Sequence, residues 1–193
     1  MADEIKEFNT APGVTVAREL LIAFLNTGTK EAPVWSPVGK RVEDSSMELD
    51  WQTEQKTDIF GDTYTTGKKA TRTQTFDPCE LDSSDPAQQK IWKLGIKDND
   101  VNALLNQDML IAHFYAGGTA AGTGNFAERY ESCSVLPTGL GGEGGGSIGM
   151  PLEVTYGGAR TTGTVGKDET GKTTFTPDTA SVARMSMRNM TID

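Results

Sequence analysis

Residues 166–173 read GKDETGKT and match, letter for letter, the G-x-x-x-x-G-K-[ST] pattern of a nucleotide-binding phosphate loop. Such a loop works because a buried strand leads into it and a helix leads out, so that free helix N–H groups face the phosphates. Here residues 161–165 are too polar for a buried parallel strand, and the following TTFTP is β-branched and ends at proline. We therefore predict two threonine-rich strands joined by a charged turn from Gly166 to Lys172.

Three other features could carry chemistry, and each favours a structural interpretation. The string GLGGEG at 139–144 matches G-x-G-x-x-G, but it lacks the opening helix and the acidic ribose ligand, so we predict a flexible connection. Cys79 and Cys133 form no spacing motif and are interpreted as free, buried thiols, with a disulfide as the alternative. His113 lies in an apolar run and is interpreted as a hydrogen-bonded packing residue.

Acidic residues are numerous, but they alternate along strands predicted to be exposed. A glycosidase needs two carboxylates with different protonation states, and nothing in the sequence sets one acid apart from its neighbours. Two cysteines and a single histidine cannot build a metal cluster. We expect no catalytic residue, no cofactor and no metal, and hence no enzyme; the rival hypothesis is a nucleotide hydrolase that uses Lys172 and Thr173.

The composition narrows the class of protein further. The 193 residues carry a net charge of −9, which disfavours a protein that binds nucleic acid by neutralising phosphates but permits one past which nucleic acid slides. Only 36% of the residues are hydrophobic, so we expect a small core and surfaces that are buried on assembly. The polar N-terminus is unlike a signal peptide, and no apolar run approaches the roughly 20 residues of a membrane span. Synthesis in a cytoplasm is therefore expected.

Strands dominate the predicted elements of the first half. Residues 14–26 favour a strand over a helix, and residues 44–54 alternate between acids and a face of Met47, Leu49 and Trp51, which predicts one face in the core and one in water. The polar stretch 55–69 is predicted to be a long loop or a flared hairpin, because so few of its residues can reach a core. Residues 70–76 follow as a strand that is polar on both faces.

One helix stands out in the second half. Asp85-Pro86 supplies an N-cap and a first-turn proline, and Gly95 is the expected C-cap. A short helix or turn is predicted over 100–107. The run MLIAHFYA at 109–116 is apolar on both faces and predicts a strand buried on both sides. Further strands are expected at 126–136 and 152–160, and the last residues, 178–193, as an arm.

Three strings together carry a family resemblance. They are PVWSPVGK…TDIFGD…CELD from Pro33 to Asp82, the helix DPAQQKIWKLG, and MLIAHFYA followed by ERYESCSVLPTGLGGEGGGSIGMPLEVTYGG. In this order, over roughly Ala32 to Gly158, the chain resembles the major tail tube proteins of tailed bacteriophages and related contractile injection systems. The termini, including GKDETGKT, do not take part in the resemblance.

The resemblance implies one mainly β domain over residues 1–193, with arms at about 1–13 and 178–193. Its fold would be an antiparallel β-sandwich or barrel with one flanking α-helix and a long inter-strand loop, joined into hexameric rings that share an inner β-barrel. The rings would stack into the tail tube of a virion, whose lumen holds the tape-measure protein and later conducts DNA into the host without binding it specifically. Tail terminator and baseplate or tip proteins would be the other partners.

The resemblance also suggests roles for two sets of residues. Glu48, Asp50 and Glu54 would face the lumen, where their charge repels phosphates, and Ile59, Phe60 and Tyr64 would anchor the long loop on the adjacent ring. Two alternatives remain at this point: the tube of a contractile bacteriocin-like particle, and a β-sandwich decoration or binding module of a virion. The sequence does not distinguish a contractile from a flexible tail.

Overall fold

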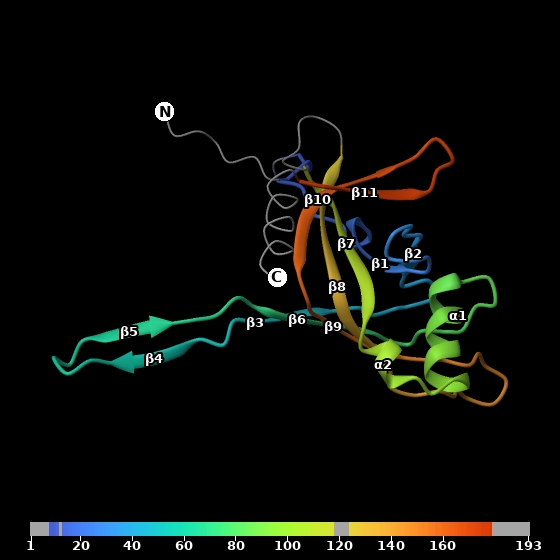
Figure 1. Cartoon of the computed structure of the whole chain (residues 1–193), viewed down its shortest axis with the longest axis horizontal. Helices are drawn as coiled ribbons and strands as arrows, with labels where there is room; N and C mark the ends of the chain where they lie inside the picture. Colours follow the sequence, from blue (N-terminus) through green and yellow to red (C-terminus); the bar gives the residue numbers. More distant parts are fainter. Residues whose placement is uncertain (1–7, 12, 118–123, 179–193) are drawn as a thin grey trace, which may run out of the picture.

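The computed structural model describes residues 8–11, 13–117 and 124–178, and it is a mainly β, antiparallel fold with one clear α-helix (Figure 1). Of the expected arms, 1–13 and 178–193, the described residues include 8–11, 13 and 178, and the others lie outside them. The strands are β1 (Leu21–Asn26), β2 (Trp35–Val38), β3 (Met47–Asp50), β4 (Glu54–Thr57), β5 (Thr63–Thr66), β6 (Thr71–Phe76), β7 (Gln107–Gly117), β8 (Asn125–Pro137), β9 (Leu152–Tyr156), β10 (Arg160–Lys167) and β11 (Thr173–Pro177). The helical segments are the 3-10 turn η1 (Arg18–Leu20), α1 (Pro86–Trp92), the π turn η2 (Lys93–Lys97) and α2 (Val101–Leu104).

Nine of these strands form one sheet, and β8 is the strand at which the sheet divides. Along one edge β8 pairs with β7, while along the other it pairs first with β10 (Asn125 to Tyr130) and then with β9 (Ser134 to Pro137). The strand thereby joins an arm made of β2, β1, β7, β10 and β11 to an arm made of β9, β6 and β3. The small two-stranded sheet β4–β5 is separate from both.

The main core lies between the two arms and under α1. It contains fully buried side chains from β1, β6, α1, β7 and β9, among them Leu25, Phe76, Ile91, Met109 and Val154. A smaller cluster covers the opposite face of β1 and β7, where Phe24 and Leu110 pack with Trp35 and Val165. The prediction that 109–116 is buried on both sides is confirmed for 109–112, where alternate residues of β7 enter different clusters, whereas 113–116 are only half-buried.

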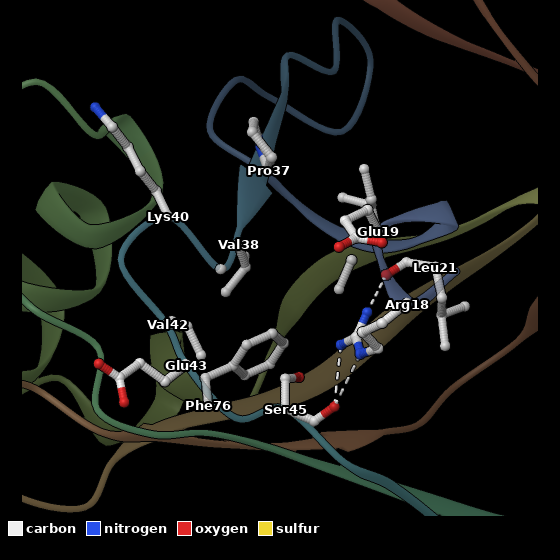
Figure 2. A pocket seen from close by; sticks show the side chains of 13 residues that line it. Arg18, Glu19, Leu21, Pro37, Val38, Lys40, Val42, Glu43, Ser45 and Phe76 are labelled. Atoms are coloured by element: carbon white, nitrogen blue, oxygen red, sulfur yellow. Dashed lines mark hydrogen bonds between the residues drawn. The ribbon is translucent and has the colours of Figure 1, made fainter. Parts of the chain in front are cut away.

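The sheet does not close into a barrel within the described part of the chain. A cavity of about 490 Å³ lies where β1 and β2 face the segment before β3 and the end of β6, and Phe76 lies in its wall (Figure 2). Arg18 spans this side: its guanidinium donates to the carbonyl oxygen of Leu21 at 2.5 Å and to that of Ser45 at 3.0 Å. The predicted sandwich or barrel is therefore, in the single chain, an open, bent sheet.

Helix α1 begins as predicted and ends differently. Asp85 caps it, since its Oδ1 accepts hydrogen bonds from the backbone N–H groups of Ala87 (2.9 Å) and Gln88 (3.2 Å). Gly95 is not the C-cap, because the chain continues from α1 into η2, which contains Gly95. A Cβ at Gly95 would lie 2.8 Å from Cγ of Pro137, so close packing against the end of β8 accounts for this glycine.

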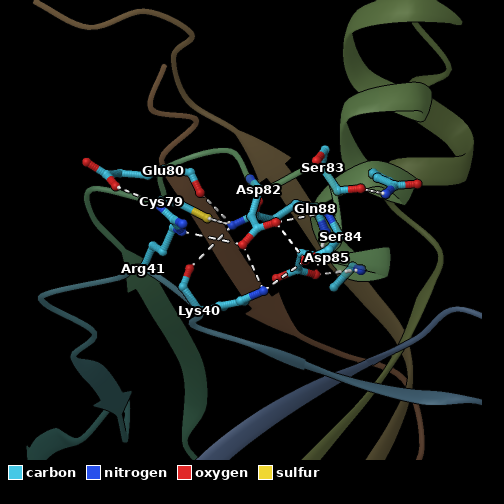
Figure 3. A network of polar contacts seen from close by, with 11 residues as sticks. Lys40, Arg41, Cys79, Glu80, Asp82, Ser83, Ser84, Asp85 and Gln88 are labelled. Atoms are coloured by element: carbon cyan, nitrogen blue, oxygen red, sulfur yellow. Dashed lines mark hydrogen bonds and ion pairs between the residues drawn. The ribbon is translucent and has the colours of Figure 1, made fainter. Parts of the chain in front are cut away.

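A polar network fixes the N-terminal end of α1 to the loop after β2 (Figure 3). Asp82 pairs with Lys40 at 2.7 Å and with Arg41 at 3.4 Å, and its backbone N–H donates to Oε1 of Gln88 at 2.6 Å. The buried Gln88 also donates to the carbonyl oxygen of Glu80 at 2.9 Å. Hydrogen bonds from Lys40 and Ser84 lower the pKa of Asp82, so it remains charged within this network.

Two strand predictions need correction. Residues 14–26 do not form one strand, because η1 precedes β1 and only Leu21–Asn26 is extended and paired. Likewise, the alternation over 44–54 becomes strand only at Met47–Asp50, and Leu49 (49%) and Trp51 (57%) are exposed instead of buried. Met47 on the same face packs against the main core, but the core does not extend to Leu49 and Trp51, and Gln52, with φ +45°, lies just beyond the end of the strand.

Candidate functional site

A threonine-rich, acidic face covers one side of the arm that contains β3, β6 and β9. The register aligns Glu48 with Thr73, Thr73 with Thr155, and Thr155 with Ser134 of β8. Residues paired in register point to the same face of a sheet, and successive residues of a strand point to opposite faces. These two rules identify the residues of this face. They are Ser46, Glu48, Asp50, Thr71, Thr73, Thr75, Ser134, Leu136, Glu153 and Thr155. We call this set the acidic sheet face; it contains three carboxylates and no basic side chain.

Of the three acids predicted to line a lumen, two lie on this face. Glu48 and Asp50 are exposed on β3, whereas Glu54 begins β4 in the separate two-stranded sheet and pairs with Lys56 at 3.1 Å. The third acid of the face is Glu153, which the sequence reasoning missed. The alternation of Leu152, Glu153 and Val154 was the signal available, because it sets Glu153 opposite two buried residues.

The acidic sheet face ends at an unpaired strand edge. Within the described residues, β3 pairs with β6 alone, so its other edge offers free backbone N–H and C=O groups. A shallow cavity of about 230 Å³ on the face has Glu48 and Glu153 in its wall, together with Thr73 and Thr75. An exposed edge of this kind is a template for pairing with another strand.

The sequence predicts a long loop or a flared hairpin over 55–69, and the structure has the hairpin. β4 and β5 pair from Glu54–Thr66 to Thr57–Thr63, and all of their residues are exposed. Figure 1 shows the hairpin extending far from the rest of the molecule. At its tip Ile59 is 94% and Phe60 84% exposed, and Tyr64 on β5 is 49% exposed. These three apolar side chains therefore have no core of their own to fill.

The turn at the tip of the β4–β5 hairpin and the turn within GKDETGKT are built in the same way. In the tip, Oδ1 of Asp58 accepts from the N–H groups of Phe60 (2.8 Å) and Asp62 (3.0 Å), and Gly61 has φ +86°. In GKDETGKT, Oδ1 of Asp168 accepts from Thr170 and Lys172 at 2.9 Å each, and Gly171 has φ +79°.

The second turn joins β10 to β11, which pair as predicted, so Lys172 and Thr173 are followed by a strand and not by a helix. The geometry that a phosphate loop requires is therefore absent at 166–173. Asp168 remains ionised in the turn, because hydrogen bonds from Thr170 and Lys172 lower its pKa. The glycine stretch 139–149 likewise forms turns and an isolated bridge between Gly141 and Gly149, with no helix after it.

An ionic cluster lies under the start of β10. Glu128 is 2% exposed, accepts from Arg160 at 2.5 Å and from the hydroxyl of Tyr130 at 2.9 Å, and also pairs with Arg72. Burial alone would raise the pKa of Glu128, but the hydrogen bond from Arg160 and the two guanidinium charges outweigh it and lower that pKa. One carboxylate thus faces two arginines, and the cluster keeps a positive charge.

The isolated titratable residues are structural. His113 Nδ1 lies 2.8 Å from the Tyr115 hydroxyl, as the hydrogen-bonded packing interpretation predicted, and burial lowers its pKa. Cys79 and Cys133 are free and fully buried, which confirms the thiol prediction, and burial raises the pKa of Cys133 to about 12. In the ranges that the structure describes, no three His, Cys, Asp or Glu residues gather as metal ligands would. No helix in those ranges is long and apolar enough to span a membrane.

Comparisons with solved structures find chains that are similar to this one. A chain in the tail of an empty GTA particle, a structure with C6 symmetry, has a TM-score of 0.50 and 9% sequence identity over 76% of this chain and 98% of that chain. A PVC sheath/tube terminator of an extracellular contractile injection system, in its extended state, has a TM-score of 0.49 and 9% identity over 79% of this chain and 99% of its own. A chain of the PVC sheath-tube complex has a TM-score of 0.44 and 11% identity over 80% and 95%.

The fold shared with the GTA tail chain defines the class of architecture. It is a mainly antiparallel sheet with one short helix, found there in a component of a tail-like particle. No protein-family model matches the sequence, and no curated protein matches it by sequence.

Proposed function

We propose that this protein is a structural subunit of a phage tail tube, or of the tube of a related contractile particle, and that it assembles with itself into stacked hexameric rings. The observation that carries the proposal is the acidic sheet face with its unpaired β3 edge. Joining that edge to the sheet of a neighbouring copy closes a wall that one chain leaves open. The GTA tail chain with the same fold comes from a structure with C6 symmetry, which fits six copies per ring.

In such a ring the acidic sheet face lines the lumen. Glu48, Asp50 and Glu153 then repeat around the passage, interspersed with threonine hydroxyls that keep the wall hydrated. A wall of carboxylates repels DNA phosphates across a distance of about a Debye length, roughly 8 Å at physiological salt, so DNA slides without adhering. The tape-measure protein occupies the same passage during assembly. Terminator and baseplate or tip proteins close the ends of the tube in the finished virion tail.

The β4–β5 hairpin is the contact between rings. Exposed Ile59, Phe60 and Tyr64 become buried anchors when the hairpin docks on a subunit of the adjacent ring. Apolar anchors on a projecting hairpin are unusual for a protein that works alone, because they would expose it to aggregation. The rival function, a decoration or binding module, leaves this tip without a use.

Negative-stain electron microscopy of the purified protein over rising concentration tests the proposal. Rings and then tubes are expected from the wild type, whereas an Ile59→Ser/Phe60→Ser variant is expected to stop at rings. Lys172→Ala is the matched control on the other hairpin, and its assembly should equal that of the wild type. A wild type that remains a monomer or trimer at high concentration would favour the binding module, and nucleotide binding lost in Lys172→Ala would favour the hydrolase.

A further inference from the structure

Another cavity, at the base of the β4–β5 hairpin, is lined by basic side chains and aromatic rings. Its volume is about 580 Å³, and we call it the cationic cavity. The lining side chains that matter here are Trp51, Lys69, Arg72, Tyr130, Tyr156 and Arg160. Trp51, in its wall, is 57% exposed.

The charge of this cavity distinguishes it from three others on the described surface. The cavity in Figure 2 balances Arg18 and Lys40 with Glu19 and Glu43. A third, beside β11, pairs Arg129 with acids, and the one on the acidic sheet face has only carboxylates as charged groups. The cationic cavity has three basic side chains in its wall and no carboxylate.

The positive charge of the cationic cavity is not fully neutralised by the acid that lies behind its wall. Glu128 is the acid behind the wall, and it is shared between Arg72 and Arg160. Lys69 is exposed, and no salt bridge to it is found within the described residues. The aromatic part of the wall is ordered, since the rings of Tyr130 and Tyr156 lie 5.3 Å apart between centroids and Arg72 lies 5.8 Å from the centroid of the Tyr130 ring.

One exposed segment of the same chain has the complementary chemistry. The hairpin tip, Asp58 to Asp62, presents two carboxylates around Ile59 and Phe60 and contains no base. Oδ1 of Asp58 holds the turn, but no hydrogen bond or salt bridge of the Asp62 side chain is found within the described residues. Its apolar side chains, Ile59 and Phe60, are 94% and 84% exposed. The carboxylates of the tip thus complement the basic side chains of the cavity, and its apolar side chains complement the aromatic rings.

The tip cannot reach the cavity of its own chain. Lys68 N–H bonds to the carbonyl oxygen of Trp51 at 3.1 Å, which puts the base of the hairpin at the cavity. The nine residue-to-residue steps from Trp51 to Phe60 extend about 30 Å at the usual rise per residue, and Figure 1 shows the hairpin pointing away from the body. A tip from another copy is therefore the occupant, and the contact is head-to-tail.

We propose that the cationic cavity is the receiving site for the hairpin tip of a second copy of this chain, with Asp62 facing Lys69 and Phe60 against Trp51. This inference rests on the proposed function and names the surface that the hairpin meets. A head-to-tail contact closes into a ring only if the rotation between copies allows it, and otherwise it repeats along one axis, as stacked rings require. The unpaired β3 edge makes a different contact, within a ring, and is untouched by changes at Asp62 or Lys69.

Charge exchange tests the pairing. Asp62→Lys and Lys69→Asp should each raise the protein concentration needed for tubes at least about tenfold, while rings persist. An equimolar mixture of the two variants restores complementarity at every contact between unlike copies and should form tubes within about threefold of the wild-type concentration. Lys68→Asp, on the neighbouring residue outside the cavity, is the matched control and should assemble as the wild type does. Sedimentation and electron microscopy supply the readout, and thermal melting confirms that each variant is folded.

Each other outcome contradicts the pairing. Single variants that assemble like the wild type, or a mixture that fails to restore tubes, would show that the tip docks elsewhere while the tube proposal stands. A wild type that forms neither rings nor tubes would overturn both proposals. A fluorescent single-stranded oligonucleotide that binds the wild type and not Lys69→Asp, with assembly unchanged, would make the cavity a phosphate site instead.

Discussion

Glu128 is the residue that holds the two arms of the sheet together electrostatically. It lies on β8, while Arg72 and Arg160 come from β6 and β10, so one carboxylate joins three strands. Removing one partner of a buried ionic group leaves the others uncompensated, which is more costly than the net value of the contact itself. The arrangement therefore specifies how β6 and β10 sit against β8.

We predict that stability falls on acidification and that Glu128 is one cause. Its pKa is lowered from the ordinary 4.5 in the folded state, so its contribution is present above pH 4.5 and is lost as pH falls through the folded value. Glu128→Gln should cost about 3 kcal/mol at neutral pH and flatten the loss of stability below about pH 4.5. Urea unfolding of both proteins over a pH series measures this. An unchanged pH dependence in the variant would contradict it.

At the scale of elements, the two hairpins are built alike and joined differently. Both turn on an aspartate that caps two backbone N–H groups and on a glycine with positive φ. β10–β11 belongs to the nine-stranded sheet and contributes Val165 and Phe175 to the smaller cluster. β4–β5 is a separate sheet with no buried residue, so its order is decoupled from the core.

The same substitution should therefore have different effects in the two turns. An alanine at Gly171 or Gly61 must adopt a left-handed conformation, at a cost of about 1 kcal/mol, and its Cβ meets no atom within 4 Å in either turn. We expect Gly171→Ala to lower the global free energy of unfolding by about this amount, because its hairpin is part of the cooperative unit. Gly61→Ala should leave the global value unchanged and loosen the tip alone.

Chemical denaturation, with hydrogen exchange to follow the tips, separates the two effects. Gly139→Ala is the control, since that glycine has neither a positive φ nor an atom near its Cβ position. Equal losses of global stability at Gly61 and Gly171 would show that β4–β5 is coupled to the body after all.

At the scale of the whole molecule, the surface divides into an acidic face, a projecting hairpin and a cationic cavity. The acidic sheet face and the cavity lie on opposite sides of the β3–β6 strand pair, because Glu48 and Asp50 alternate with Leu49 and Trp51. In the proposed tube, one side of this strand pair faces the passage and the other receives the next ring. A net charge of −9 per copy adds a repulsion between copies, which complementary contacts must outweigh.

Reversing the charge of the acidic sheet face should change how a tube treats DNA. We predict that tubes of a Glu48→Lys/Asp50→Lys/Glu153→Lys variant retain short labelled DNA at low salt and release it at high salt. The reason is that salt screens the attraction between the introduced lysines and the DNA phosphates. Wild-type tubes should exclude the same DNA. Co-sedimentation at two salt concentrations measures retention, and a Glu54→Lys variant tests whether the hairpin acid belongs to the passage. Exclusion of DNA by the triple variant would place these acids outside the lumen.

Local sequence determined a good part of this molecule. The alternation in 109–116 predicted two buried faces, Asp85-Pro86 predicted the start of α1, and the residues around GKDETGKT predicted a hairpin in place of a phosphate loop. Each of these depends on interactions between residues close in the chain, such as capping, side-chain alternation and turn chemistry, so the pattern is readable without the fold. The exposure of residues 55–69 belongs here too, since a stretch with so few apolar residues cannot be held in a core, although the sequence left a loop and a hairpin as alternatives.

Tertiary structure alone decided which distant residues meet. Glu153 joins Glu48 through two strand registers, and Arg72, Glu128 and Arg160 meet because β8 changes partners along its length. Alternation gives Leu49 and Trp51 a shared face but cannot say whether the core extends that far, and here it does not. Pairing between distant strands depends on the register and bend of the whole sheet, and no short stretch of sequence is sufficient to determine these.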